Sequence, residues 1–279
     1  MLSRLLSISL RMPAKKPVRS PMRNIKLTLE YDGTNYYGFQ RQPQQNTIQQ
    51  ELEAALQKLF RKKVKLVSAS SRTDAGVHAE DQVVHFKSNS SLSVHRIERG
   101  LNHFLPDDIS ILKAEDVSDD FHARFQPVSK IYEYHVWNYS SRPALLRGRT
   151  CHVPQILNFA AMKQAAKRLI GKHDFRAFTS EKLVAKNPGI SHKKISFVRT
   201  LKKCSIQKKD KIIVFTVQAD GFLYHMVRNL VGTLIAVGKG KLKAQDIKLI
   251  LLSRDRKQAA ATLPACGLTL KKVIYPKSE

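Results

Sequence analysis

Residues 64–87 read VKLVSASSRTDAGVHAEDQVVHFK, and this stretch decides the fold. Val64–Ala69 and Gln82–Lys87 are rich in apolar and β-branched residues, which predicts two neighbouring strands. The polar loop between them begins with SSRTDAG, in which an aspartate stands between an arginine and a glycine: Arg72, Asp74 and Gly76. We therefore expect a strand pair whose connecting loop presents a carboxylate beside a cation and a flexible residue.

The segments on either side of this strand pair complete a βαββαβ unit. Ile25–Tyr31 alternates apolar and polar residues, as a strand does, and Ile109–Ala114 is a further strand. Apolar residues recur at helical spacing in two segments: Ile48–Phe60 and Val94–Phe104. Asn46 or Thr47 is suited to cap the first of these helices.

The second half of the chain repeats this order, with one extra helix. Its predicted strands are Ile131–Trp137, Ile195–Ile206, Lys211–Ala219 and Gly267–Tyr275. Its predicted helices are Gln155–Ile170, Tyr224–Val237 and Asp246–Leu252. Gly171 is placed to end the first of these helices.

We predict an α+β protein of two tandem ferredoxin-like (RRM-like) βαββαβ halves, with an active-site cleft between them. The predicted units are a basic disordered extension (1–23), an N-terminal half carrying the Asp74 loop (24–127), and a basic C-terminal half (128–279). Basic sheets of this kind also occur as RNA-recognition modules, whose aromatic residues stack on bases. An RNA-binding module and an enzyme acting on RNA are therefore both open on the fold alone.

The positive charge of the chain is large and unevenly distributed. There are 49 Lys and Arg residues against 22 Asp and Glu, a formal net charge of +27. Residues 24–133 hold 14 basic and 15 acidic side chains, whereas residues 134–279 hold 29 and 7. Neutralising phosphates releases counterions, so such an excess attracts a polyanion. The distribution indicates that the C-terminal half faces nucleic acid.

The first 21 residues, MLSRLLSISLRMPAKKPVRSP, contain no acidic residue and are rich in Arg and Ser. We expect an unstructured extension of a cytoplasmic protein. An organellar transit peptide, or an upstream start codon with Met22 as the true beginning, are the alternatives. No apolar run approaches the roughly 18 residues that a membrane span needs, so we expect no membrane partner.

Cysteine, histidine and glycine patterns predict neither a metal nor a cofactor. The three cysteines are far apart and form no CxxC pair: Cys151, Cys204 and Cys266. We expect free thiols in a reducing compartment. His78–Glu80 matches the H-x-E part of a zinc deaminase signature, but the P-C-x-x-C part is absent, so a metal lacks ligands. No phosphate-cradling glycine-rich loop occurs. We expect structural roles for His85 and His225.

Asp74 has two interpretations on its local chemistry. An ionised, oriented carboxylate can act as a covalent nucleophile, and Arg72 favours the ionised form. Gly76 permits the tight turn that brings a loop close to a ligand. Alternatively, Asp74 only caps a turn and pairs with Arg72, as loop aspartates often do. The local residues support both interpretations equally.

Five segments, in family order, resemble the TruA family of tRNA pseudouridine synthases. The Asp74 loop, RTDAGVHA, resembles the catalytic loop of that family. The other four segments are YDGTNYYGFQRQ (31–42), FHAR (121–124) with KIYEY (130–134), HDFRAF (173–178) and HMVRNLVG (225–232). The match runs from about Arg23 to Tyr275.

The resemblance implies roles for individual residues. Asp74 corresponds to the aspartate that bonds covalently to the target uridine, and Arg228 to the basic residue paired with it. Tyr132 corresponds to the tyrosine proposed to remove the C5 proton, although a water molecule is an alternative base. Arg72 corresponds to the arginine tied to base flipping. The candidate substrate-binding residues are Arg72, Phe39, Gln40, His78 and Arg124.

The resemblance implies an isomerase that converts uridine to pseudouridine at positions 38, 39 and/or 40 of the tRNA anticodon stem-loop. It also implies a homodimer that grips one tRNA across both subunits. The reaction exchanges an N-glycosidic bond for a C–C bond without net redox change or hydrolysis, so it needs no cofactor. The alternatives are a non-catalytic tandem RNA-binding module, for which Asp74, Tyr132 and Arg228 are not required, and a synthase acting on another RNA.

Three positions depart from the family pattern. Phe39 stands where the family often has Trp, Ser71 where Gly commonly precedes RTD, and Asp81 where Gly is usual. Ser71 removes backbone freedom beside Arg72. None of the three replaces a catalytic group, so we expect activity to survive.

Overall fold

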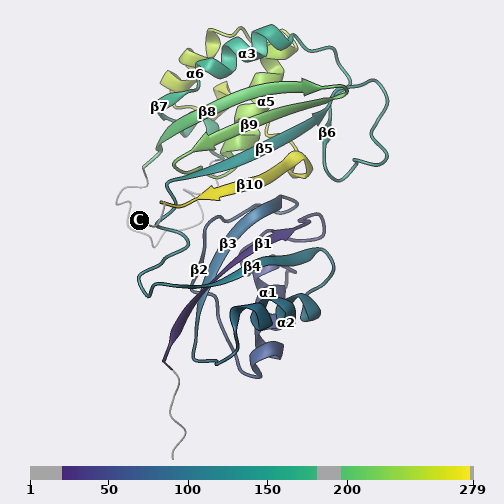
Figure 1. Ribbon diagram of the computed structural model, residues 1–279. Helices are drawn as coiled ribbons and strands as arrows, with labels where there is room; N and C mark the ends of the chain where they lie inside the picture. Colours follow the sequence, from purple (N-terminus) through teal and green to yellow (C-terminus); the bar gives the residue numbers. More distant parts are fainter. Residues whose placement is uncertain (1–20, 181–195, 277–279) are drawn as a thin grey trace, which may run out of the picture.

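The computed structural model describes residues 21–180 and 196–276 (Figure 1). The predicted extension over residues 1–23 therefore lies almost wholly outside the described residues, as does Ile195 at the start of one predicted strand. The described residues form a mixed α+β fold.

The strands, in chain order, are β1 (Arg23–Tyr31), β2 (Ser68–Ala69), β3 (His78–Ser88), β4 (Ile109–Val117), β5 (Ser129–Trp137), β6 (Cys151–His152), β7 (Gly171–Asp174), β8 (Val198–Lys209), β9 (Ile212–Ala219) and β10 (Leu268–Ile274). The α-helices within the described residues are α1 (Ile48–Phe60), α2 (Val94–Phe104), α3 (Phe159–Lys167), α5 (Met226–Gly238) and α6 (Asp246–Ser253). One 10-stranded sheet has the order β4-β1-β3-β10-β5-β9-β8-β7, with β2 beside β3 and β6 beside β5.

The last strand, β10, lies in the middle of the sheet and joins the two halves of the chain (Figure 1). It runs parallel to β3, where Thr269 pairs with His78, and antiparallel to β5. Asp81 strengthens the junction because its carboxylate accepts the backbone N–H of Val273 at 2.7 Å and lies 3.3 Å from Lys272 Nζ. The aspartate that stands where the family usually has glycine thus ties β3 to β10.

The helices bury one face each against this sheet, apart from α5. In Figure 1, α1 and α2 lie beside β1, β3 and β4, and α3, α5 and α6 lie beside the strands of the second half. Thr47 caps α1 by accepting the N–H of Gln50, and the buried face of α1 includes Leu52 and Leu56. Helix α5 is buried along nearly its whole length, as its apolar sequence requires.

Both helices of the first half have the predicted bounds, but its two central strands do not. The strand predicted at Val64–Ala69 is only the two-residue β2, because the N–H of Leu66 donates to Glu53 Oε1 on α1 instead of to a strand. Strand β3 begins at His78, before the predicted Gln82, since its first residues pair with β10.

The prediction of a helix from Gln155 to Ile170 was wrong at both ends. Asn158 caps α3 by accepting the N–H of Ala161, so the helix begins at Phe159 and ends at Lys167. Gly171 does not end the helix but opens β7, which pairs with β8. The sequence GKHD of β7 is too polar to signal a strand, and β7 forms only because β8 provides a partner edge.

Candidate active site

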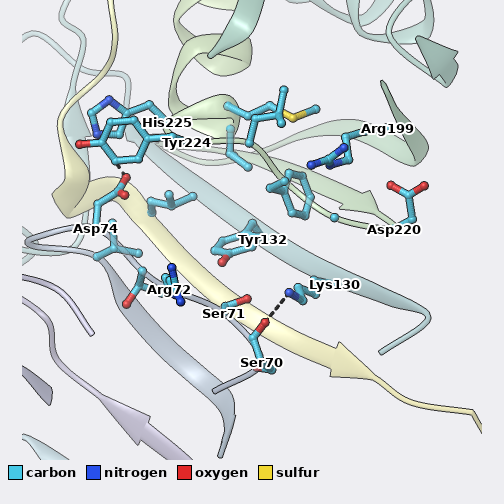
Figure 2. Close-up of a pocket in the computed structure, with 18 of the residues that line it drawn as sticks. Ser70, Ser71, Arg72, Asp74, Lys130, Tyr132, Arg199, Asp220, Tyr224 and His225 are labelled. Atoms are coloured by element: carbon cyan, nitrogen blue, oxygen red, sulfur yellow. Dashed lines mark hydrogen bonds and ion pairs between the residues drawn. The ribbon is translucent and has the colours of Figure 1, made fainter. Parts of the chain in front are cut away.

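A cavity of about 650 Å³ lies between the Asp74 loop and the strands of the second half (Figure 2). Sites for small organic ligands have volumes of about 300–1,000 Å³, so a nucleotide fits. Four of the predicted site residues line the cavity: Arg72, Asp74, Arg124 and Tyr132. They come from both halves of the chain.

The Asp74 loop is held by the segment that precedes α1. The N–H of Phe39 donates to Thr73 O at 3.0 Å, and the N–H of Gly76 donates to Tyr36 O at 3.2 Å. Gly38 has φ of +92°, and a Cβ there would lie 2.7 Å from Thr73 O. Only glycine allows the backbone at position 38 to come this close to Thr73 O, which explains the glycine in the 31–42 segment.

A buried amide supports the loop from below. Gln82 is fully buried, its Oε1 accepts the hydroxyl of Ser70 at 2.6 Å, and its Nε2 donates to Ser71 O at 2.9 Å. Tyr31 and Thr73 continue the network through a hydroxyl pair at 2.7 Å. Ser71 has no positive φ, so serine fits where the family commonly has glycine.

Asp74 contacts two residues at the start of α5. Its Oδ2 lies 3.2 Å from Arg228 Nη1 and 3.5 Å from His225 Nε2. Arg228 is fixed in turn, because its Nε donates to Leu263 O at 2.7 Å. The side chains of Asp74 and Arg228 are 18% and 15% exposed, so solvent screens their attraction only partly. The pair that the resemblance implies is present in the structure.

His225, for which the sequence predicts a structural role, lies beside Asp74. Its side chain lines the cavity beside Asp74, stacks on Tyr224 at 3.8 Å between ring centroids, and has Ser180 Oγ 2.9 Å from its Nδ1. The sequence held a signal for this position: His225 and Arg228 are three residues apart, which places them on one side of a helix start.

Tyr132 faces the cavity from β5. Its side chain is buried, and the ring of Phe222 packs edge-on against it at 5.0 Å. Burial raises the pKa of Tyr132 to about 12; a hydrogen bond with Ser71 opposes the rise, and the charge of Asp74 adds to it. The phenol is therefore protonated at neutral pH in the free protein.

Two other predicted residues lie next to the cavity rather than in it. Phe39 is buried, packs against Tyr31, and borders a neighbouring cavity of about 190 Å³ with Gln40. Arg72 is exposed and lines both cavities, so it stands between them.

His78 lies outside both cavities. Its ring is 1% exposed, its Nε2 is 3.2 Å from Cys266 O, and its Nδ1 lies 3.2 Å from the N–H of Gly33. Burial lowers the pKa of His78, whereas the charge of Asp32, whose Oδ1 lies 3.0 Å from His78 Nδ1, opposes this fall. His78 thus links the two halves in the free protein, and its contact with substrate stays a prediction.

The described residues contain no group of His, Cys, Asp and Glu side chains that could hold a metal ion. The three cysteines are free thiols. No helix within residues 21–180 and 196–276 is long and apolar enough to cross a membrane.

A surface that only binds RNA gains nothing from a carboxylate in its cavity, because a carboxylate repels phosphate. Asp74 is nevertheless held there by a dedicated arginine and by a loop that several buried hydrogen bonds support. This arrangement is typical of an active site and places the chain in the class of enzymes.

The chain belongs to the tRNA pseudouridine synthase family, an isomerase family, whose model matches residues 28–126 and 165–276. tRNA pseudouridine synthase A of Acetivibrio thermocellus is 46% identical over 254 residues, which cover 91% of this chain and 100% of the relative. tRNA pseudouridine synthase A 2 of Clostridium perfringens has the same identity and coverage. tRNA pseudouridine synthase A of a Thermoanaerobacter species is 43% identical with the same coverage. The resemblance found in the sequence is thus confirmed.

Replacing Arg228 with methionine is expected to lower kcat/KM for pseudouridine formation by about 10²-fold. Removing one partner of a partly buried charge pair costs about 3 kcal/mol, and Asp74 would lose the cation that orients it. The rate is measured on unmodified tRNA with Arg96→Met, an exposed change on α2, as the control. Equal rates for the two variants would contradict a role for the pair.

Proposed function

We propose that this chain isomerises uridine to pseudouridine at positions 38, 39 and/or 40 of the tRNA anticodon stem-loop, with Asp74 as the nucleophile. The observation that carries the proposal is the Asp74–Arg228 contact at 3.2 Å beside a cavity large enough for a nucleotide. The target uridine must leave its stack to enter, at a cost of a few kcal/mol. Arg72, exposed between the two cavities, is suited to occupy the vacated space.

The proposed reaction balances without a cofactor. Asp74 bonds to the nucleotide, the N1–C1′ bond breaks, and the uracil turns over until C5 bonds to C1′. The C5 proton then leaves, N1 ends protonated, and Asp74 is released. Bonds and protons are exchanged within one nucleoside, so the sum is an isomerisation.

Tyr132 is the proposed acceptor of the C5 proton. Because burial raises the pKa of Tyr132 to about 12, its phenol carries a proton before the reaction begins. It must therefore pass that proton on while it accepts the one from C5. The Ser71 side chain, which acts against the rise in the pKa of Tyr132, is suited to relay it.

The proposed architecture is a pair of ferredoxin-like units, residues 24–127 and 128–279. The strand orders β4-β1-β3-β2 and β10-β5-β9-β8 support it, because each half then has its first and third strands at the centre.

We further propose a cytoplasmic homodimer that binds one tRNA anticodon arm. The free thiols support a reducing compartment, and the family resemblance supports the dimer. Light scattering should give twice the chain mass of 31.7 kDa.

Pseudouridine mapping on unmodified tRNA tests the function. The purified full chain is incubated with the tRNA in the presence of a metal chelator and no cofactor. Conversion at one or more of positions 38–40 is the expected result. Binding without conversion would support the RNA-binding module instead, and conversion elsewhere would correct the substrate.

The affinity for tRNA is expected to fall steeply with salt. Six phosphate contacts or more would weaken binding by about 10³-fold between 50 and 200 mM salt, because each contact releases counterions. The excess of basic residues after residue 133 supports contacts on that scale. Dissociation constants are measured across this range with the Asp74→Asn variant, which prevents turnover. A flat response would contradict broad phosphate contact.

A further inference from the structure

Three cations that line the cavity lie close enough for the charges of two of them to act on the third, Lys130: they are Arg124, Lys130 and Arg199. Figure 2 shows Lys130 and Arg199 on the side of Tyr132 that faces away from Asp74. They come from different elements, since Lys130 lies on β5 and Arg199 on β8. Their convergence is therefore a product of the fold and not of local sequence.

No carboxylate of the described residues lies within ion-pair distance of these three side chains, although twelve Lys or Arg ion pairs form among those same residues. Asp220 is the acidic residue that lines this part of the cavity. Both of its oxygens accept the N–H of Thr200, at 3.0 and 3.1 Å. The three cations at this end therefore outnumber the lining carboxylate of Asp220, whose charge acts on Arg199 without forming an ion pair, and Asp74 lies at the other end.

Two of the cations are held in place by carbonyl groups. Lys130 Nζ donates to Ser70 O, and Arg199 Nη1 donates to Ser196 O at 2.8 Å. Carbonyls orient the cations without neutralising them. The side chains are therefore prepared for an external anion, which lowers the entropy lost on binding.

Without a bound anion, the cluster of Arg124, Lys130 and Arg199 destabilises the protein, because the charges are partly desolvated and repel one another. Burial lowers the pKa of Lys130 to about 8, and the positive charges of Arg124 and Arg199 contribute to this fall. Burial also lowers the pKa of Arg199, and the charge of Asp220 opposes this fall. An anion placed among the three groups would offset both the desolvation and the mutual repulsion.

We infer that Arg124, Lys130 and Arg199 form a phosphate subsite, which binds a phosphodiester of the RNA strand next to the target nucleotide. The inference rests on the proposed function and deepens it. Guanidinium forks and a lysine point charge suit phosphate oxygens. With the phosphate at this end and Asp74 repelling it from the other, the sugar and base of the nucleotide are directed toward Asp74.

An exposed aromatic ring beside the subsite favours a nucleic-acid strand over a free anion. Phe125 lines the cavity and is 73% exposed, and its ring stacks on His122 at 4.3 Å between centroids. The guanidinium of Arg124 lies 5.4 Å from that ring. Unstacked bases bind to such combinations of aromatic and cationic groups.

A double-mutant cycle between protein and RNA tests the subsite. Full-length protein carrying Asp74→Asn binds tRNAs in which one phosphate flanking the target uridine is a neutral methylphosphonate. One such position is expected to weaken binding about tenfold, as loss of a charge-assisted contact does. That methylphosphonate is expected to weaken tRNA binding little further when the protein also carries Lys130→Met or Arg199→Met. With Lys130→Arg in the protein, the methylphosphonate should still weaken binding about tenfold.

The control variant is Lys208→Met, which removes an exposed lysine of β8 outside the cavity and should leave the methylphosphonate effect unchanged. Circular dichroism identifies a variant that fails to fold. If either Lys130→Met or Arg199→Met fails to fold, the double-mutant cycle is measured with the other. Additive losses at every flanking phosphate, for both cavity variants, would overturn the subsite.

The proposed function is tested separately, by the conversion of uridine to pseudouridine in unmodified tRNA by the unaltered chain. Conversion together with additive cycles would remove the subsite and leave the function. Binding and coupling without conversion would keep the subsite and remove the function. Absence of tRNA binding would overturn both.

Discussion

Replacing Asp74 with asparagine is expected to lower pseudouridine formation by about 10⁴-fold or more while leaving tRNA binding intact or slightly tighter. The amide keeps the shape of the side chain but cannot form the covalent bond. It also removes a negative charge that repels the RNA. Single-turnover conversion and the dissociation constant are measured on the same unmodified tRNA.

The control for this experiment is Asp107→Asn, which changes an exposed carboxylate after α2. Both variants should fold, because Arg228 keeps its hydrogen bond to Leu263 O when Asp74 is replaced. Full activity in Asp74→Asn would remove Asp74 from the nucleophile role. Loss of tRNA binding together with activity would instead indicate that the loop needs the Asp74–Arg228 pair to keep its conformation.

Replacing Tyr132 with phenylalanine is expected to slow the reaction by about 10²–10⁴-fold, the usual contribution of general acid–base catalysis. The ring and its edge-on packing against Phe222 are retained, so binding and stability should change little. The step that becomes slower would be the removal of the C5 proton. Deuterium at C5 of the target uridine should therefore produce a larger isotope effect in the variant than in the unaltered chain.

Tyr139→Phe is the matched control, because Tyr139 is 45% exposed and does not line the cavity. Unchanged rates in Tyr132→Phe, with no change in the isotope effect, would assign proton removal to another base. A Ser71→Ala variant extends the experiment. If Ser71 relays the phenolic proton, its loss should reproduce part of the Tyr132→Phe isotope effect.

In the first half of the chain, the two helices were easier to predict from the sequence than the two central strands. The bounds of α1 and α2 follow from apolar spacing and from capping residues, which are local features. Strands β2 and β3 depend on partners far along the chain, and both differ from their predicted lengths. The early start of β3 at His78 required β10, whose residues lie about 190 positions later.

The candidate site divides in the same way. The RTD loop was visible because glycine, arginine and aspartate stand together in sequence. His225, Lys130 and Arg199 were not identified as cavity residues, because each lies in a segment that reads as an ordinary strand or helix start. His78 was named as a candidate substrate-binding residue from the sequence, but the structure shows that it is buried outside the cavity.

The sequence by itself determined the bounds of α1 and α2, the α+β class, the charge asymmetry and the loop that carries Asp74, because periodicity, capping and composition are local properties. Only the tertiary structure decided that Arg228 lies 3.2 Å from Asp74 across 154 residues, and that three cations face the other end of the cavity. Strand periodicity specifies which face of a strand is buried and not which strand lies beside it. The pairing of β3, β10 and β5 therefore brings the two halves of the site together.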